Sequence, residues 1–562
     1  MNRNNEAHFL NVPQLNISRS RFNRQQDIKL TFDAGELIPF YVDEVLPGDT
    51  FSVDQAAIIR MTTPKYPVMD NAYIDFYYFF VPNRIIWDHW KEFMGENNTG
   101  PWEQKVEYTV PTLKIKGGTG SNRPFPDEGS VLDYMGIPAK MTKTTGEETE
   151  IKINALPIRA YVKIWNEWFR DQNVDNPAVN YTDDADQEYV AGGADKTEIT
   201  TEQKLKWAAH GGYPLPVNRY HDYFSSVLPS PQKGPSVMLP LTGNAPVKLY
   251  NPGTNDIFNA NNGKIWITVG RDGAPSIYNE GNETRVNGSS ETINGDKLTA
   301  TLKTDLGTAE AATINQLRQA FQVQKYYEEC ARGGTRYREI IRSLFGTTIS
   351  DKTVQIPEYL GGQRVPININ QVIQTSQTTE TSPQGNTGAM SVTTMNKSQF
   401  TKSFEEHGWV LGLCCVRHDH TYQQGIERMW FRKDKLDYYY PVFANLGEQA
   451  VLKRELYATG ETANDESVFG YQEAWAEYRM KPNRVAGKFR SNATGTLDVW
   501  HYADNYSATP NLSQEWMKEG KNEIARTLLI QDEPQFIMDV LVSNVSTRPM
   551  PIYSVPGLID HH

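Results

Sequence analysis

The run at residues 409–416 (WVLGLCCV) limits most strongly how this chain can fold. It is apolar throughout and rich in residues that favour strands, yet it is far shorter than the roughly 20 residues that a membrane-spanning helix needs. We therefore expect a strand that is buried in a folded core. The chain then turns polar over residues 417–420 and reaches three consecutive tyrosines at 438–440, which indicates a rigid aromatic contact loop.

Other strand-like runs occur near both ends of the chain. Residues 28–61 hold several short apolar runs, and residues 72–81 (AYIDFYYFFV) form the most strand-prone run before Pro82 ends it. A further run, at residues 535–545, lies near the C-terminus. Turn residues separate the early runs at short intervals, which is typical of a β-sandwich or jelly roll. We predict one mainly β domain over residues 28–562, with long insertions.

Helical periodicity is confined to two regions. Residues 155–170 place Trp165 and Trp168 on one aromatic face. A capping box at Thr313 opens a helix that we expect to end at Gly333-Gly334, and a second helix follows up to Gly346. We expect solvated acidic loop over residues 171–205 and featureless polar loop over residues 371–398.

Charge and cysteine content exclude some classes of protein. The formal net charge is −12, which argues against a protein whose whole surface binds nucleic acid. We find no apolar run of about 18 residues and hence expect no membrane insertion, and the first ten residues do not resemble a signal peptide. Cys414 and Cys415 are adjacent and Cys330 stands alone, which indicates synthesis in a reducing, intracellular compartment.

The N-terminal residues 1–27 are irregular and more basic than the rest of the chain. They carry four arginines against Glu6 and Asp27, so they form either a solvated tail or a basic arm that contacts phosphate. If the arm contacts phosphate, its candidate nucleic-acid-binding residues are Arg3, Arg19, Arg21 and Arg24.

Residues 242–309 differ in composition from their surroundings, because asparagine, glycine and threonine dominate. Only short strand-like pieces occur, at residues 264–269 and 298–302. We predict a small β insertion that is displayed outward. The candidate contact residues on this insertion are Asn261, Asn262, Trp266, Asn282 and Asn287.

Two chemical alternatives remain open. His418 and His420 would share one face of a strand and could approach a metal, but no third ligand stands nearby at a familiar spacing, so we expect no metal site and no cofactor. A β-sandwich glycosidase would need two facing carboxylates, for which Glu405, Glu406 and Glu427 are available. A carbohydrate-binding adhesin would share the fold and the aromatic surface.

Several segments together resemble the major capsid protein of microviruses (Microviridae), and most closely the gokushovirus-like branch. They occur in family order over most of the chain: residues 161–173 (YVKIWNEWFRDQN), 219–234 (RYHDYFSSVLPSPQKG), 313–321 (TINQLRQAF), 331–346 (ARGGTRYREIIRSLFG), 357–362 (PEYLGG), 404–440 and 474–488 (AWAEYRMKPNRVAGK).

The resemblance implies an eight-stranded antiparallel viral jelly roll and a structural protein, not an enzyme. In that family, sixty copies form a T=1 icosahedral shell around a circular single-stranded DNA genome, and a variable insertion forms a threefold protrusion that faces the host. Long loops make most of the subunit contacts. Our candidates for those contacts are Trp165, Trp168, Tyr220, Tyr223, Trp430, Tyr438, Tyr439 and Tyr440.

The resemblance also implies partners and a location. The expected partners are further copies of the chain, the packaged single-stranded DNA, a small basic DNA-binding virion protein, an internal scaffolding protein, a pilot (minor virion) protein and a bacterial surface receptor. The expected location is the capsid of the virion, which would assemble in the bacterial host cytoplasm.

Overall fold

The computed structural model describes most of the chain outside the central insertion. It covers residues 18–97, 107–116, 126–139, 150–190, 199–235, 237, 314–378 and 383–553, together with the backbone of five short strands between residues 247 and 304. Contacts between Cα atoms divide the chain into two units, residues 1–231 with 330–562 and residues 232–329, and each unit is described by itself.

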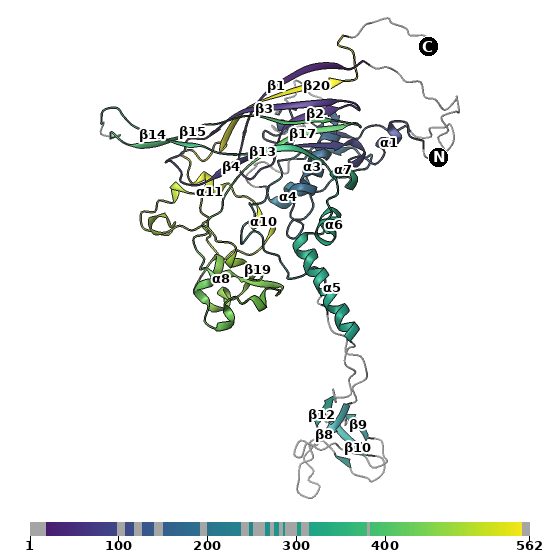
Figure 1. Cartoon of the computed structure of the whole chain (residues 1–562), viewed down its shortest axis with the longest axis vertical. Helices are drawn as coiled ribbons and strands as arrows, with labels where there is room; N and C mark the ends of the chain where they lie inside the picture. The colour runs from purple at the N-terminus through teal and green to yellow at the C-terminus, as the bar shows by residue number, and fades with distance from the viewer. Residues whose placement is uncertain are drawn as a thin grey trace. The chain divides into compact units, whose positions relative to one another are not determined.

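The first unit is built on two four-stranded antiparallel sheets (Figure 1). One sheet has the order β1-β20-β3-β16 and the other β13-β4-β17-β2, so strands from the two ends of the chain pair directly. The mainly β, antiparallel sandwich that we expected is therefore present. The strands are β1 (Ser20–Phe32), β2 (Ile38–Val45), β3 (Thr50–Met61), β4 (Ala72–Pro82), β13 (Glu358–Pro366), β16 (Thr393–Ser403), β17 (Gly408–His418) and β20 (Phe536–Arg548).

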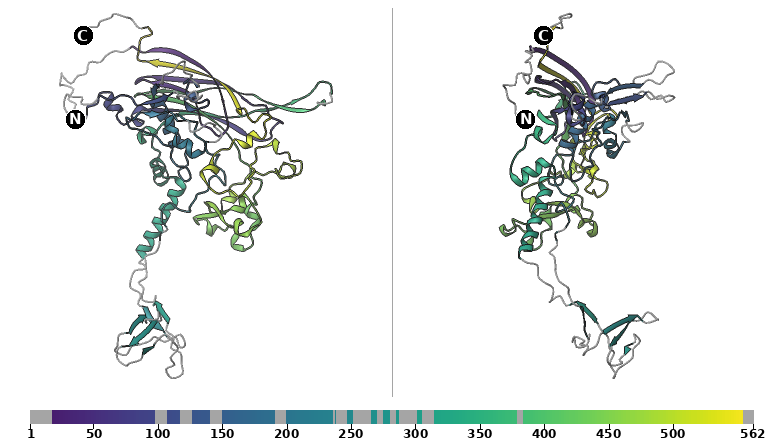
Figure 2. Two further views of the ribbon diagram at one scale, coloured as in Figure 1. Left: turned by 180° about the vertical axis from the view of Figure 1, so that it is seen from behind. Right: turned by 90° about the vertical axis from the view of Figure 1, so that its right-hand side faces the viewer.

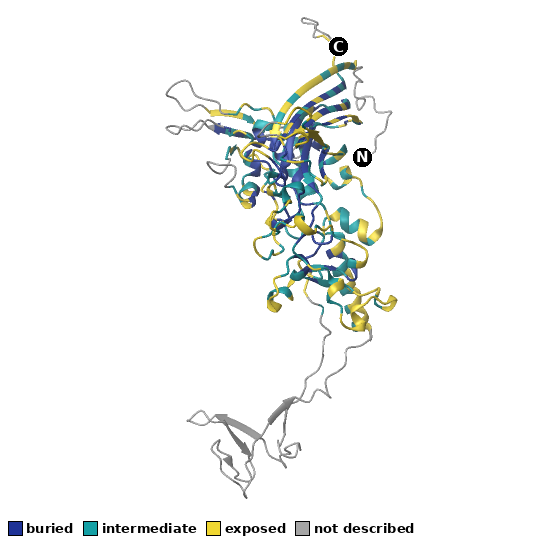
Figure 3. Ribbon diagram, turned by 90° about the vertical axis from the view of Figure 1, so that its left-hand side faces the viewer, coloured by how far each residue is buried: buried dark blue, intermediate teal, exposed yellow. Residues whose placement is uncertain are grey.

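The main core lies between these two sheets. In β20 every second residue from Phe536 to Val542 is buried, whereas Ile537 and Leu541 are exposed on the outer face. This period of two is that of a strand with one solvated face. Aromatic rings fill the space between the sheets, and Tyr78 donates a hydrogen bond to Gln55 across it at 3.0 Å. Figure 3 shows the buried residues concentrated in the sandwich.

The strand β17 is buried on both faces. Val410 and Cys414 belong to the core between the sheets, whereas Leu411 and Leu413 belong to a second core on the outer side. This explains why residues 409–416 are apolar without alternation, as the sequence suggested.

The second core is closed by the predicted helix. We predicted one continuous α-helix over residues 155–170. The structure has the α-helix α3 (Leu156–Ile164), followed by a π-helical turn, η3 (Trp165–Phe169). Its aromatic face packs against β4 and β17, where Trp165 and Tyr161 are completely buried. The helix therefore covers the outer face of one sheet.

Two segments that we expected to be irregular belong to sheets. Residues 371–398 hold most of a hairpin formed by β14 (Ile369–Ile373) and β15 (Thr387–Ser391), and the start of β16, and the hairpin extends beyond the sandwich (Figure 2). Strand β1 starts at Ser20, inside the predicted N-terminal arm 1–27, and pairs with β20 over its whole length. Both segments are polar because they are largely exposed, so an apolar pattern could not reveal them.

The acidic segment 171–205 is also more ordered than expected. Asp184 accepts a hydrogen bond from Trp87 at 2.6 Å, and Asp186 accepts one from the Thr112 amide at 2.9 Å. These carboxylates therefore tie the segment to the turn at Trp87 and to the strand that begins at Thr112. A small sheet here contains β5 (Thr112–Lys116), β6 (Glu150–Asn154) and β7 (Gln187–Glu188).

The remaining elements of the first unit are short. Among the described helices, none is both long and apolar enough to cross a bilayer. The elements are β18 (Glu448–Leu452) and β19 (Val468–Glu473), α1 (Trp90–Phe93), α2 (Val131–Tyr134), α4 (Thr201–Lys206), α6 (Tyr337–Phe345), α7 (Asp351–Val354), α8 (Lys453–Leu456), α9 (Thr462–Asp465), α10 (Gln514–Met517) and α11 (Asn522–Ala525), with one-turn 3-10 helices between them.

The second unit, residues 232–329, contains five short strands and most of one helix. Strand β8 (Val247–Tyr250) pairs with β12 (Thr301–Thr304), and β10 (Pro275–Asn279) pairs with both β9 (Ile265–Val269) and β11 (Arg285–Val286). The helix α5 (Ile314–Gly333) ends where we predicted. These five strands lie between residues 247 and 304, within the predicted insertion 242–309.

Gly412 gives a direct test of how closely the aromatic rings of the neighbouring strands β2 and β4 pack over β17. A Cβ atom built there would lie 2.9 Å from Phe40 Cζ and 3.0 Å from Tyr78 Cε1, inside the ring cluster between the sheets. We expect Gly412→Ala to lower the free energy of unfolding by about 1–3 kcal/mol through overpacking, measured from denaturant-unfolding midpoints of the purified subunit. The matched control is Gly388→Ala in β15, where the nearest atom is 3.9 Å away. Equal midpoints for both variants would contradict this packing.

Candidate functional site

An exposed aromatic loop, residues 428–446, is the first candidate site. It contains three one-turn 3-10 helices, η7 (Arg428–Phe431), η8 (Lys435–Asp437) and η9 (Pro441–Phe443), which are too short to bury their own side chains. Trp430 is 70% exposed and Val442 is 87% exposed, and Tyr438, Tyr439 and Tyr440 are between 42% and 50% exposed. Four of the predicted contact residues therefore lie on the surface of the subunit.

The aromatic loop is held in place by contacts at its base. The Tyr439 ring lies 5.8 Å from that of Trp475, and Trp475 Nε1 donates a hydrogen bond to the Phe443 carbonyl at 3.3 Å. Arg432 pairs with Glu477 at 2.8 Å. The loop thus presents apolar rings from a fixed base, which reduces the entropy lost when a partner binds.

The other four predicted contact residues are wholly or partly buried inside the subunit. Trp165 is completely buried and donates to the Pro216 carbonyl, and Tyr223 is 6% exposed and donates to Glu455. Their burial removes both from the surface available to a second copy. Trp168 and Tyr220 are half-buried, each beneath an arginine.

The basic residues of the predicted arm lie in different settings. Arg19 and Arg21 are exposed, Arg24 forms an ion pair with Asp43, and Arg3 lies outside the described residues. Arg24 is therefore committed to a contact within the subunit.

The basic residues near the aromatic loop are also paired with acids. Arg417 forms an ion pair with Asp75, and Arg428 forms one with Glu455. Together with the Arg432–Glu477 pair, these contacts are internal to the subunit.

The candidate receptor-facing residues fall almost entirely outside the described part of the chain. Asn261, Asn262, Asn282 and Asn287 lie outside the described residues. Trp266 lies in β9, of which only the backbone is described.

The carboxylates considered for a glycosidase are each engaged with a different base. Glu405 pairs with Lys352, Glu406 with Arg84, and Glu427 with Lys481. These separate ion pairs give the carboxylates structural roles.

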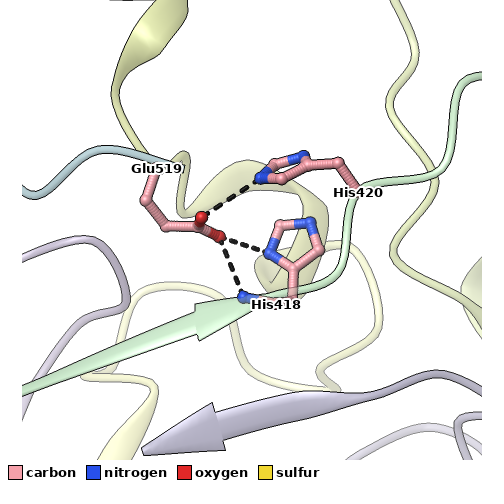
Figure 4. Close-up of side chains that lie close together, drawn as sticks. All are labelled: His418, His420 and Glu519. Carbon is pink, nitrogen blue, oxygen red and sulfur yellow. Dashed lines mark hydrogen bonds and ion pairs between the residues drawn. The ribbon is translucent and has the colours of Figure 1, made fainter. Parts of the chain in front are cut away.

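A buried cluster of two histidines and a glutamate is the second candidate site (Figure 4). His418 ends β17, His420 follows two residues later, and Glu519 lies just after α10. One oxygen of the Glu519 carboxylate lies 3.1 Å from His420 Nε2, and the other forms a close ion pair with His418 Nδ1. The three side chains are at most 1% exposed.

Further charges hold this cluster in place. His420 Nδ1 lies 2.9 Å from an Asp504 oxygen, and Asp504 also pairs with Arg219. The hydroxyl of Tyr506 donates to Asp504 at 2.6 Å. The segment after α10 is therefore joined to β17 and to the 219–220 region by one connected set of buried polar groups.

The neighbouring charges in the cluster favour the protonated form of His420 and the ionised form of Asp504. Burial opposes protonation of His420, but the attraction of Asp504 and Glu519 raises its pKa to about 10. Burial would likewise raise the pKa of Asp504, but the charges of His420 and Arg219 hold it well below its usual value. The stabilisation by Asp504 is therefore present above the usual aspartate pKa of about 4 and declines as the pH falls below it.

Glu519 is the residue of this cluster that the sequence could not identify. We expected no metal site because no third ligand stands near His418 in the sequence, but the fold brings Glu519 to within reach of both histidines. No spacing rule connects these positions, because the contact depends on where the C-terminal segment crosses the end of β17.

Asp504 tests how much this buried network stabilises the subunit. Asp504→Asn leaves the buried Arg219 without its charged partner and removes one of the two carboxylates that face His420, so we expect a loss of about 3–5 kcal/mol in the free energy of unfolding. The measurement is equilibrium unfolding at pH 7, with Asp54→Asn on the exposed face of β3 as the control. If both variants retained wild-type stability, the network would not have the role described here.

Comparison with known proteins gives a consistent result over nearly the whole chain. Residues 10–558 match the family described as capsid protein (F protein). The chain is 39% identical to the capsid protein VP1 of Bdellovibrio phage phiMH2K, over 99% of this chain and 98% of that protein. It is 38% identical to the capsid protein VP1 of Chlamydia phage 1, covering 98% and 97%, and 38% identical to the capsid protein VP1 of Spiroplasma virus 4, covering 96% of each.

These relatives are structural components of phage particles, and the family is not one of enzymes. Capsid proteins act by assembling with copies of themselves, which agrees with the exposed aromatic loop. The chain therefore belongs to the capsid protein (F protein) family, in its gokushovirus-like microvirus branch, and is a structural major capsid protein of the virion.

Proposed function

We propose that sixty copies of this protein form a T=1 icosahedral shell around a circular single-stranded DNA genome. The observation that carries the proposal is the family match over residues 10–558, combined with a β-sandwich subunit that exposes an aromatic loop. The test is electron microscopy of the protein expressed with its scaffolding partner. Closed particles of one small size support the shell, whereas small closed oligomers alone would favour the adhesin alternative.

The aromatic loop is the surface that we assign to contacts between subunits. Its exposed side chains include a tryptophan and three tyrosines, which are the residue types that dominate the energy of protein interfaces. The loop is anchored at Trp475 and by the Arg432–Glu477 pair, so a neighbouring copy would meet a preformed surface. Burial of these rings would supply the main gain in free energy on assembly.

Val442 provides a test of this contact that leaves the subunit intact. The side chain is 87% exposed, so Val442→Asp should leave the unfolding midpoint of the isolated subunit nearly unchanged. In an apolar interface the new carboxylate would be buried without a partner, and we expect particle yield in sedimentation gradients to fall at least about tenfold. Val442→Thr, which has a similar volume and no charge, should retain most of the yield. Wild-type yield from Val442→Asp would exclude Val442 from a subunit contact.

The negative charge of the packaged DNA must be neutralised by positive charge, and this chain supplies only part of it. Its formal net charge is −12, and among the arginines considered for the arm, Arg19 and Arg21 are exposed, whereas Arg24 is paired with Asp43. We propose that Arg19 and Arg21 contact phosphate on the inner surface and that a small basic virion protein supplies most of the positive charge. An internal scaffolding protein and a pilot protein complete the proposed set of assembly partners in the bacterial cytoplasm.

We assign attachment to a bacterial surface receptor to the insertion at residues 242–309. Its support is that residues 232–329 form a compact unit of their own, in which the described strands pair with one another. Such a unit can vary in sequence without disturbing the sandwich. The threefold axis is the proposed position of the resulting protrusion.

Deletion of residues 248–304 separates attachment from assembly. The deletion removes β9, β10, β11 and β12 and all of β8 except Val247, and leaves the sandwich strands intact. We expect particles to form at a yield close to that of the wild type but to lose adsorption to host cells, measured as free particles remaining after incubation with the host. Loss of particle formation would contradict a role confined to display.

A further inference from the structure

We propose that His418, His420 and Glu519 bind one divalent transition-metal ion, zinc by the chemistry of its ligands. The ion would be structural and would fasten the end of β17 to the segment that follows α10 (Figure 4). The proposal concerns the stability of the subunit, so it is independent of the shell geometry, the DNA and the receptor proposed above.

The ligand atoms are the right kind and are close together. Two imidazole nitrogens and a carboxylate oxygen lie within 4.8 Å of one another, and all three residues are buried. A zinc ion that bonds nitrogen and oxygen at about 2.0–2.2 Å keeps its ligand atoms roughly 3–4 Å apart. Small side-chain rotations therefore convert the observed arrangement into a coordination shell, in which a water molecule would be the fourth ligand.

The surroundings of His418 give a second, independent reason to place a metal ion at this cluster. Its side chain is completely buried, and Nε2 has no hydrogen-bond partner among the described residues. Nδ1 nevertheless lies in close contact with a Glu519 oxygen, which is the contact drawn in Figure 4. A nitrogen lone pair and a carboxylate repel each other in a buried site unless a cation lies between them, and that cation is either a proton or a metal ion.

The balance of charge is the same for a metal ion as for two protons. One ion of charge two bound by two neutral imidazoles carries the same charge as two imidazolium rings. The ring centroids of His418 and His420 are only 4.2 Å apart, so two imidazolium rings would repel each other strongly. A single metal ion removes that repulsion while satisfying the Glu519 carboxylate.

The outer contacts of His420 match those of a metal ligand. With Nε2 on the metal, Nδ1–H donates to Asp504 at 2.9 Å, and Asp504 is itself held by Arg219 and by the Tyr506 hydroxyl. A carboxylate that accepts from the second nitrogen of a metal-bound histidine fixes the tautomer and the ring orientation. The backbone amide of His418 also donates to Glu519 at 3.3 Å, which orients the carboxylate.

The test measures zinc in particles or subunits that are purified without chelator, incubated with Zn²⁺ and passed through gel filtration. We expect elemental analysis to give about one zinc ion for each wild-type subunit, and Glu519→Gln to lower zinc affinity by at least about tenfold. The matched control is Asp419→Asn. Asp419 stands between the two histidines, but its carboxylate lies 3.3 Å from the Tyr73 hydroxyl. This control should keep its zinc.

If Glu519→Gln does not fold, the zinc ligands can be identified in the wild-type protein by X-ray absorption spectroscopy at the zinc edge. Two imidazole ligands with oxygen in the remaining positions are expected. Three results would each overturn the proposal: wild-type protein without stoichiometric zinc, full zinc retention in Glu519→Gln, or sulfur ligands at the metal. The first result would mean that protons alone hold the two histidines against Glu519.

Discussion

Burial of β17 on both faces is the constraint on which the rest of the subunit depends. A strand in the middle of one sheet of a sandwich normally has one face against the other sheet and one against solvent. Here the outer face is covered as well, by α3 and the π-helical turn after it, so two cores share one strand. Gly412 lies where rings from neighbouring strands meet over this strand, which leaves no space for a side chain.

The same strand connects the core to the regions that act outside it. It ends at His418, and the residues after it enter the buried network of Glu519, Asp504 and Arg219 before the chain continues into the aromatic loop. The N-terminal side of the aromatic loop therefore follows directly from this buried network, and Tyr439 within the loop packs against Trp475. A shell protein needs this rigidity because subunit contacts made by a mobile loop would lose much of their free energy to ordering.

The sequence predicted the parts of the fold whose side chains alternate or cluster in an obvious way. Residues 72–81 and 409–416 were recognisable because both faces of those strands are apolar. The first part of β1, residues 20–27, and strand β14 were not predicted, because their exposed faces are polar and carry no apolar period. Helical spacing correctly placed Trp165 on an apolar face, but spacing alone cannot distinguish a core from a subunit contact, and the structure places this residue in the core. The role of Glu519 could not be predicted for a different reason: its contact with His418 depends on tertiary folding alone.

The central claim is that the aromatic loop of one subunit is covered by a neighbouring subunit in the shell. A cryo-electron microscopy reconstruction of the assembled particle, at a resolution that shows side chains, measures this directly. Our account predicts that Trp430, Val442 and the three tyrosines 438–440 lose most of their exposed surface to an adjacent copy. A reconstruction in which these side chains face solvent would contradict it, and the contacts that hold the shell together would then lie elsewhere on the subunit.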